Sequence, residues 1–237
     1  MTGWGDELAA WWIEELASDT AYASEVVPVA LDLLRPQPGR RYLDLGCGQG
    51  RVMEELAAAG AEGLGVDLSR RLLDSAKQWG PVVRASLPSL GWMGDGSVDG
   101  AITVLVLEHL EDAGTFFEET ARVVRPGGVL ALVVNHPVLT APDSGPIVDP
   151  DDDEVLWRWG GYFASGYTEE PAGPGTVRFH HRSTADLLTA AADAGWSLER
   201  LVEAPAGQQR RRRDALLAAQ AHVPRLLGAR WTRGEGP

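Results

Sequence analysis

The sequence YLDLGCGQG, residues 42–50, joins a short apolar strand to a glycine-rich turn. Three glycines at alternate positions let backbone N–H groups approach a ligand closely, with the N-terminus of a helix behind them. A dinucleotide-binding turn has the spacing G-x-G-x-x-G, whereas the spacing here is G-x-G-x-G. Asp44, two residues before the first glycine, opposes a pyrophosphate and suits a cationic amino group. The turn therefore predicts a site for a ligand that carries such a group.

A second carboxylate follows at the spacing that a ribose would require. Asp67 ends the next predicted strand, 21 residues after Gly46. An acidic residue at this place can accept hydrogen bonds from both hydroxyls of a ribose. Either aspartate alone could be a simple turn residue at a strand end. The pair at this spacing favours a ligand-binding role.

Short apolar strands alternate with helices on both sides of the turn. The expected strands span 41–45, 63–67, 81–85, 100–105 and 128–135, with helices over 51–59, 70–79 and 112–124 between them. Strands with continuous apolar runs, separated by helices, imply a parallel sheet covered on both faces. Right-handed crossovers place the carboxyl end of every such strand at one edge, where ligands bind.

The flanking segments complete a single domain of residues 1–237. Two helices, over 6–17 and from about Asp19 to Leu34, form an N-terminal helical cap (1–40) before the cofactor-binding core (41–135). From His136 the alternation stops, and residues 136–182 read as an insertion that forms the substrate pocket, because long irregular stretches are usually functional. A helix over 183–194 and strands over 196–203 and 223–231 form the C-terminal part (183–237).

The insertion combines an acidic charge with aromatic side chains. It holds eight acidic and three basic residues, which makes an anionic acceptor unattractive. Its aromatic content argues against simple disorder. Four of its aromatic residues are the expected pocket walls for a flat or apolar acceptor: Trp157, Trp159, Tyr162 and Phe163.

Composition excludes several classes of protein. The formal net charge of −13 over 237 residues disfavours nucleic-acid binding, which depends on many lysine and arginine contacts to phosphate. The single cysteine, Cys47, excludes a disulfide framework. No apolar run reaches the ~18 residues of a membrane span, and the acidic start is unlike a secretory signal. The acidic run Asp149–Glu154 lacks a regular ligand spacing, so we expect no metal. These features predict a soluble, cytoplasmic protein.

Several stretches together resemble the class I S-adenosylmethionine-dependent methyltransferases, in the branch that acts on small molecules. In the order and spacing of that family, they are Leu43–Gly50, Gly65–Ser69, Asp95–Asp99, Leu107–Asp112 and Arg125–Gly128. Residues 180–183 and 198–202 resemble the C-terminal part of the same branch. The resemblance implies a doubly wound, mostly parallel seven-stranded α/β sheet with an antiparallel last strand, a Rossmann-like fold.

The resemblance also implies a set of residues for the cofactor, S-adenosyl-L-methionine. Asp44 and the backbone of Gly46, Cys47 and Gly48 would hold the methionine moiety, and the carbonyl of Leu105 would lie near its ammonium group. For the nucleoside, the implied contacts are the ribose on Asp67, the adenine beside Leu68, and the adenine amino group near Ser86 or the backbone N–H of Leu87.

Methyl transfer from a sulfonium is an in-line displacement that requires orientation, desolvation and sometimes a base. A base matters when the acceptor is a phenol, an alcohol or an ammonium, since the nucleophile must lose a proton. Histidine is the natural candidate. His109, after the fourth strand, His136, after the fifth, and His181, before the Ser183 helix cap, are the candidates.

Three functions remain after this reasoning. The first is methylation of a hydroxyl or amine of a small metabolite, with secondary metabolism as the expected setting and methylation of a quinone-like carbon as the alternative. The second is S-adenosylmethionine binding without catalysis. The third, an oxidoreductase, is disfavoured by the glycine spacing and Asp44. The expected partner is a small-molecule acceptor, for a monomer or homodimer that binds neither nucleic acid nor membrane.

Overall fold

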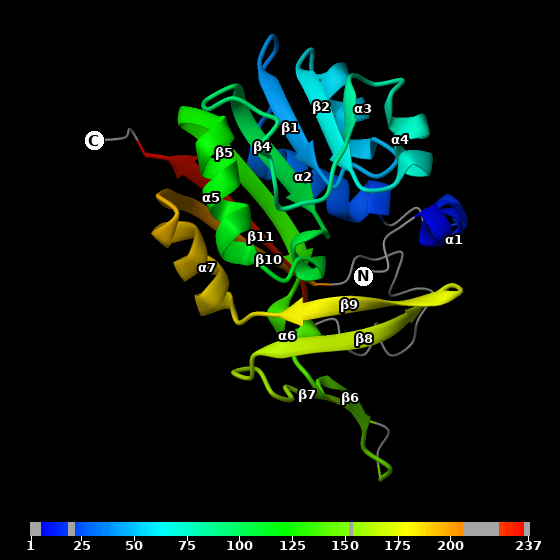
Figure 1. Cartoon of the computed structure of the whole chain (residues 1–237). Helices are drawn as coiled ribbons and strands as arrows, with labels where there is room; N and C mark the ends of the chain where they lie inside the picture. The colour runs from blue at the N-terminus through cyan, green and yellow to red at the C-terminus, as the bar shows by residue number, and fades with distance from the viewer. Residues whose placement is uncertain (1–5, 19–21, 152–153, 206–222, 235–237) are drawn as a thin grey trace.

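A seven-stranded sheet with strand order β10-β11-β5-β4-β1-β2-β3 forms the centre of the computed structural model (Figure 1). The structure describes residues 6–18, 22–151, 154–205 and 223–234. In order along the sheet, the strands are β10 (Trp196–Pro205), β11 (Pro224–Arg233), β5 (Val124–Asn135), β4 (Val98–Val104), β1 (Arg41–Leu45), β2 (Glu62–Asp67) and β3 (Val82–Arg84). Strand β11 pairs antiparallel with both β5 and β10, and the pairs from β5 to β3 are parallel. This confirms the predicted fold class.

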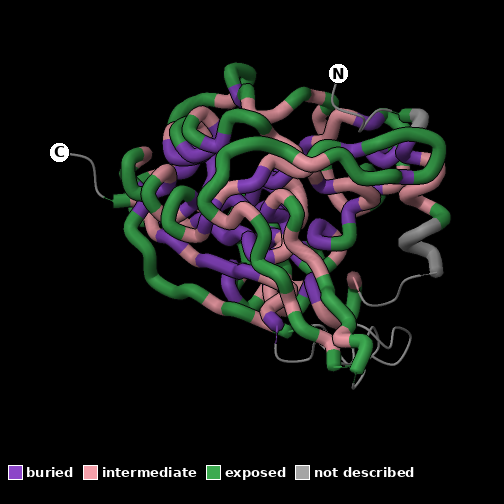
Figure 2. The backbone as a smooth tube through the Cα atoms, turned by 90° about the horizontal axis from the view of Figure 1, so that it is seen from below, coloured by how far each residue is buried: buried purple, intermediate pink, exposed green. Residues whose placement is uncertain are grey.

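Helices cover both faces of the sheet because its central strands are apolar on both sides. On one face, α5 (Ala113–Val123) packs on Leu130 and Leu132 of β5, and α7 (Thr184–Asp193) packs on β10 beside α5. On the other, α2 (Val27–Leu34) packs on the alternate residues Ala131 and Val133, and α3 (Arg51–Ala58) packs on β2. Helix α4 (Arg70–Ala76) packs beside α3. Figure 2 shows that the buried backbone is concentrated in this central sheet.

Side-chain caps start the helices where the sequence predicts them. Ser69 accepts a hydrogen bond from the Leu72 N–H at the start of α4, and Asp112 accepts one from Thr115 at the start of α5. Ser183 forms a reciprocal capping box with Asp186 at the start of α7. Each cap satisfies a backbone N–H that has no partner inside the helix.

The expected N-terminal helix over 19–34 is different in the structure. A π-helical turn, η1 (Tyr22–Val26), precedes α2, which begins at Val27. Pro28 lies in the first turn of α2, and because proline lacks a backbone N–H it is tolerated there but not inside a continuous helix. The predicted start near Asp19 lies outside the described residues.

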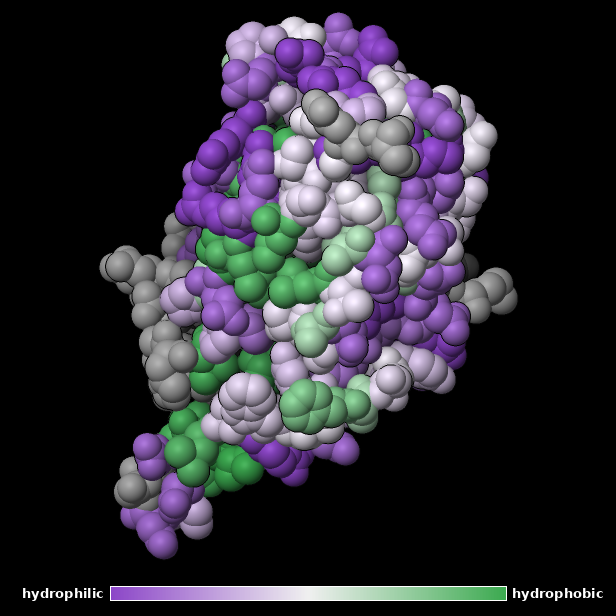
Figure 3. Space-filling view, turned by 90° about the vertical axis from the view of Figure 1, so that its left-hand side faces the viewer, coloured by the Kyte–Doolittle hydropathy of each residue, from purple (hydrophilic) through white to green (hydrophobic). Residues whose placement is uncertain are grey.

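The insertion is folded, which corrects the expectation of an irregular segment. It contains α6 (Pro137–Thr140) and two separate two-stranded antiparallel sheets, β6 (Gly145–Val148) with β7 (Val155–Arg158), and β8 (Gly166–Ala172) with β9 (Gly175–His181). In Figure 1 the β8–β9 hairpin lies across the carboxyl edge of the main sheet, whereas β6 and β7 project away from it. The projecting hairpin exposes apolar residues at the bottom of the view in Figure 3.

The first helix, α1 (Asp6–Ser18), connects the hairpin to the main sheet. Leu8 packs with Ala172 and Val177 of the β8–β9 hairpin. At the start of α1, Asp6 accepts a hydrogen bond from the Ser69 hydroxyl at 2.7 Å, beside α4. The helix and the hairpin therefore close over the edge of the sheet together. Among the described residues, no helix combines the length and the apolar character that crossing a bilayer requires.

Candidate functional site

A cavity of about 530 Å³ opens at the carboxyl edge of the sheet. Its wall is formed by α1, η1, the turn after β1, the ends of β2 and β5, the segments after β3 and β4, and β9. The side chains and backbone of these elements that line it are Ala9, Trp12, Tyr22, Gly46, Cys47, Gly48, Gln49, Arg51, Asp67, Leu68, Ser69, Leu72, Ala85, Ser86, Leu87, Pro88, Val104, Leu105, Val106, His109, Leu110, Glu111, Asp112, Asn135 and Phe179.

The glycine-rich turn is held tightly against β2. The N–H of Gly46 donates to the Val66 carbonyl at 2.8 Å. Gly46 has φ +76°, and a Cβ there would lie 2.4 Å from Val106 Cγ2, so only glycine fits. At Gly48, by contrast, a Cβ would meet nothing within 4 Å. The turn therefore leaves open space at Gly48, where a ligand can approach the backbone.

Asp67 is fixed by two backbone donors and still faces the cavity. Its Oδ2 accepts from the Gly48 N–H at 2.9 Å, and its Oδ1 accepts from the Ser69 N–H at 2.8 Å. Burial raises the pKa of this carboxyl, and the backbone hydrogen bonds oppose that shift. A carboxylate has about four acceptor positions, so each oxygen keeps capacity for one more hydrogen bond. The arrangement suits the two hydroxyls of a ribose.

Asp44 lies behind the turn and does not form part of the cavity wall. Its side chain is buried, and among the described residues its Oδ2 has no hydrogen-bond partner. Burial, together with the negative charge of Asp67, raises the pKa of Asp44 to about 8. A buried carboxyl oxygen without a partner is unfavourable, and a cationic group nearby would stabilise its charged form. This observation fits the ammonium group of the expected cofactor.

The chain turns sharply after β4, at Leu105. Leu105 has φ +56°, a left-handed conformation that is strained for a residue with a branched side chain. Its N–H donates to the Val133 carbonyl of β5 at 2.8 Å, which holds the turn in place. The turn directs the chain into η2 (Leu107–His109), the short helix that carries His109 to the cavity.

The other residues predicted to contact the cofactor line the same cavity. They are Cys47, Leu68, Ser86 and Leu87. Burial raises the pKa of the Cys47 thiol, so this side chain is neutral and serves as a small wall residue. The structure thus brings together at one cavity every residue that the sequence assigned to the cofactor, except Asp44, which lies behind the turn.

Of the three candidate histidines, only His109 reaches the cavity. Its Nδ1 lies 2.8 Å from the carbonyl oxygen of Arg178 on β9. A carbonyl can only accept, so Nδ1 carries the hydrogen, and the lone pair of the neutral imidazole is on Nε2. The ring also packs edge-on against Phe179, with 4.6 Å between the ring centroids.

His136 and His181 are placed elsewhere, contrary to the expectation that they face the acceptor. His136 is buried, with Nε2 2.8 Å from Glu203 Oε1 and Nδ1 accepting from the Val138 N–H. His181 is buried between the hydroxyl of Thr140, 3.1 Å from Nδ1, and the carbonyl of Tyr162, 2.8 Å from Nε2. The partners of both rings are supplied by the insertion and β10, so both histidines hold the insertion in place.

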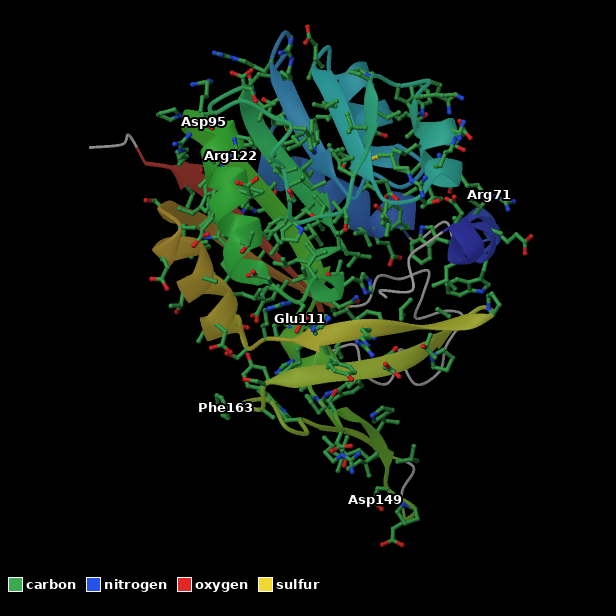
Figure 4. All side chains as sticks on the ribbon, in the orientation of Figure 1. Arg71, Asp95, Glu111, Arg122, Asp149 and Phe163 are labelled. Carbon is green, nitrogen blue, oxygen red and sulfur yellow. The ribbon has the colours of Figure 1, made fainter. Side chains whose placement is uncertain are left out.

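The aromatic walls of the cavity also differ from the prediction. Trp157, Trp159, Tyr162 and Phe163 are not part of the wall, and Phe163 is 93% exposed and points outward in Figure 4. The aromatic residues that do line it are Trp12, Tyr22 and Phe179. The two adjacent tryptophans of α1 diverge as a helix requires: Trp12 faces the cavity, whereas Trp11 packs against Gly173 at the hairpin turn.

Arg182 is a residue near the site that sequence reasoning missed. It is largely buried, and its guanidinium donates to the carbonyls of Leu107 at 3.2 Å, Glu111 at 2.6 Å and Leu110. These bonds fix the loop around His109 to the end of β9. Its place directly before the Ser183 cap was visible in the sequence, but its distant partners were not. No cluster of three His, Cys, Asp or Glu residues suited to a metal occurs in the part of the chain that the structure describes.

Comparison with known proteins agrees with this geometry. A family model described as a methyltransferase domain matches residues 43–132. The crystal structure of an S-adenosylmethionine-dependent methyltransferase from Mesorhizobium loti superposes with a TM-score of 0.77 at 26% identity, covering 89% of this chain and all of that one.

Two curated relatives match over about half of this chain. An uncharacterized methyltransferase of Mycobacterium bovis is 39% identical over 117 residues, 46% of this chain and 45% of the relative. A ubiquinone biosynthesis O-methyltransferase of Aromatoleum aromaticum is 34% identical over 128 residues, 50% of this chain and 54% of the relative. The chain therefore spans about half the length of these curated relatives.

The fold, the cavity and these matches define a class. Residues 43–132 match a methyltransferase domain, and the chain has the fold of S-adenosylmethionine-dependent methyltransferases.

Proposed function

We propose that the protein transfers a methyl group from S-adenosylmethionine to a hydroxyl or amine of a small metabolite. The observation that carries this proposal is the composition of one continuous cavity of about 530 Å³. Its wall includes the glycine-rich turn and Asp67, and it also includes His109 beside the aromatic side chains of Trp12 and Phe179. A nucleoside site and a candidate base that share one cavity are what methyl transfer to a bound acceptor requires.

The cofactor half is assigned to the residues around the turn. Asp67 binds the ribose hydroxyls, the backbone of Gly46–Gly48 and the Leu105 carbonyl hold the methionine part, and Asp44 supplies the negative charge behind it. Leu68, Ser86 and Leu87 border the adenine. When bound, S-adenosylmethionine supplies a methyl group that is already activated on a sulfonium.

His109 is the proposed base. The Arg178 carbonyl keeps the hydrogen on Nδ1, so in the neutral ring Nε2 is the nitrogen that can take a proton from the acceptor. The Arg182 bonds to the surrounding loop hold the ring in position. His136 and His181, whose ring nitrogens are bonded to residues of the insertion and β10, are not proposed as bases.

The charge and the aromatic lining of the cavity limit the chemical class of the acceptor. Glu111, Asp112 and Asp67 line it with a single arginine, Arg51, and this excess of negative charge disfavours an anionic acceptor. Trp12 and Phe179 suit a flat or apolar one. The match to a ubiquinone biosynthesis O-methyltransferase supports oxygen over the carbon of a quinone-like acceptor. We infer that the chain forms one domain and that the protein is a monomer or a homodimer. Within the insertion, we infer that the β8–β9 hairpin borders the acceptor.

The test is a screen of acceptors that follows S-adenosylhomocysteine release. Phenols, alcohols and amines should support release, and His109→Asn should lose most of it on a phenol, increasingly so toward acidic pH, because an asparagine cannot take up the proton. Trp159→Ala, which changes an aromatic residue outside the cavity, is the control and should keep wild-type turnover. Release from no acceptor, or an unchanged rate in His109→Asn, would refute the assigned chemistry.

A further inference from the structure

A carboxylate next to His109 has no role in the mechanism described so far. Glu108 is 5% exposed. Its Oε1 accepts two hydrogen bonds from one residue, Asn135 at the end of β5: one from the backbone N–H at 3.2 Å and one from the side-chain Nδ2 at 2.9 Å. Asn135 lines the cavity. Glu108 therefore touches the cavity only through Asn135.

An ion pair does not explain why the carboxylate of Glu108 is buried. Arg182, a positive charge that interacts with Glu108, gives its hydrogen bonds to backbone carbonyls, among them those of the loop around His109. Among the described residues, Oε2 of Glu108 has no hydrogen-bond partner. Burying a carboxylate is costly unless it is fully bonded. Both hydrogen bonds that Glu108 accepts come from Asn135. The buried carboxylate therefore holds Asn135 in position.

The geometry fixes which end of the Asn135 amide faces the cavity. A carboxylate only accepts hydrogen bonds, so the NH₂ group faces Glu108 and Oδ1 is turned away from it. No hydrogen bond to Oδ1 occurs among the described residues. Val133, which binds the N–H of Leu105, lies two residues before Asn135 on β5. Asn135 thus extends beyond the level of Leu105, toward the acceptor side of the cavity.

We propose that Glu108 positions Asn135 so that its Oδ1 accepts a hydrogen bond from the O–H or N–H of the acceptor before Nε2 of His109 takes that proton. The proposal rests on the methyl-transfer function proposed above. It makes Asn135 a specificity residue: acceptors with a hydrogen on the reacting heteroatom gain a bond, whereas an ether lacking that hydrogen leaves a carbonyl oxygen unpaired.

The test compares two probes, one that carries this hydrogen and one that carries a methyl group in its place. Dissociation constants of 2-naphthol and 2-methoxynaphthalene are measured with S-adenosylhomocysteine present. The wild-type protein should bind 2-naphthol about 3- to 10-fold more tightly, the range of one hydrogen bond. Asn135→Ala and Asn135→Leu should reduce this preference to the part that His109 Nε2 supports as a second acceptor. Glu108→Leu should reduce it likewise although Asn135 is still present, and Glu108→Gln, which keeps an acceptor oxygen, should restore part of it.

The affinity for S-adenosylhomocysteine and the unfolding temperature show which variants fold. If Glu108→Leu does not fold, Asn135→Ala still tests the proposal. Equal wild-type affinity for the two probes, or a preference that is unchanged in Asn135→Ala, would overturn the assignment. The outcome is separate from that of the acceptor screen. A preference for 2-naphthol without S-adenosylhomocysteine release would keep the Asn135 assignment and remove the proposed reaction.

Discussion

At the scale of single residues, we expect Asp44 to couple cofactor binding to the release of a proton. Its pKa is raised to about 8 by burial and by Asp67, so in the free protein the carboxyl is neutral over most of the range below pH 8. A bound cation favours the charged form and lowers the pKa again. Binding should therefore release a proton below pH 8, and affinity should rise with pH up to about 8 and then level off.

Calorimetric titration with S-adenosylmethionine at pH 7, in buffers of different ionisation enthalpy, measures that release directly. Asp44→Asn should bind more weakly and should show no dependence on the buffer. Equal proton release in the wild type and in this variant would mean that another group titrates.

Asp67 should contribute to affinity through two ribose hydrogen bonds. Asp67→Ala is expected to weaken S-adenosylmethionine binding by about 1–3 kcal/mol, because a charged acceptor for two hydroxyls is lost. Asp149→Ala, on the loop after β6, is the matched control and should bind as the wild type does. Since Asp67 also holds the Gly48 N–H, the unfolding temperature of the variant must be measured alongside. An unchanged dissociation constant would contradict the ribose assignment.

At the scale of elements, α1 and the β8–β9 hairpin act as one cover over the cavity. Trp12 and Phe179 line the cavity from these two elements, and Leu8 joins them by packing on Ala172 and Val177. Leu8→Ala should open this contact at a cost of about 2–3 kcal/mol, at the lower end for a buried leucine. S-adenosylmethionine affinity should fall with it.

Amide hydrogen exchange checks this prediction. Residues of α1, β8 and β9 should exchange faster in Leu8→Ala, and β1, β4 and β5 should not change. In the wild type, ligands should protect α1 and β8–β9 but not β6 and β7, which project away from the cavity. Uniform protection across the whole insertion would argue against a cover built from these elements alone.

At the scale of the whole molecule, the cofactor should bind only the folded state and stabilise it by mass action. S-adenosylmethionine at 100 times its dissociation constant should add about 2.7 kcal/mol to the free energy of unfolding. For a chain of this size, that corresponds to a rise of roughly 5–10 °C in Tm. Thermal unfolding followed by tryptophan fluorescence measures the shift. Asp67→Ala at the same concentration should show a smaller one, and NAD should give none.

The sequence by itself determined the sheet and the edge at which the proposed cofactor site lies. Short apolar runs, the Ser183 helix cap and the glycine spacing are local signals, because neighbouring residues produce them. The carboxyl ends of parallel strands share one edge, so the order of residues along the chain was enough to assign Asp67 and His109 to one edge. The family resemblance added Leu68, Ser86 and Leu105.

Only the tertiary structure decided which residues form the other half of the cavity. Trp12 lies at the cavity because α1 packs against a hairpin more than 150 residues later in the chain, a contact that no local pattern contains. His136 and His181 have the residue type and place of a base, yet distant partners bind their rings. The pairing of Glu108 with Asn135 likewise depends on the lateral order of β4 and β5. The partners of these side chains depend on long-range packing. The hydrophobic periods of a strand (2 residues) and a helix (3.6 residues) do not contain that information.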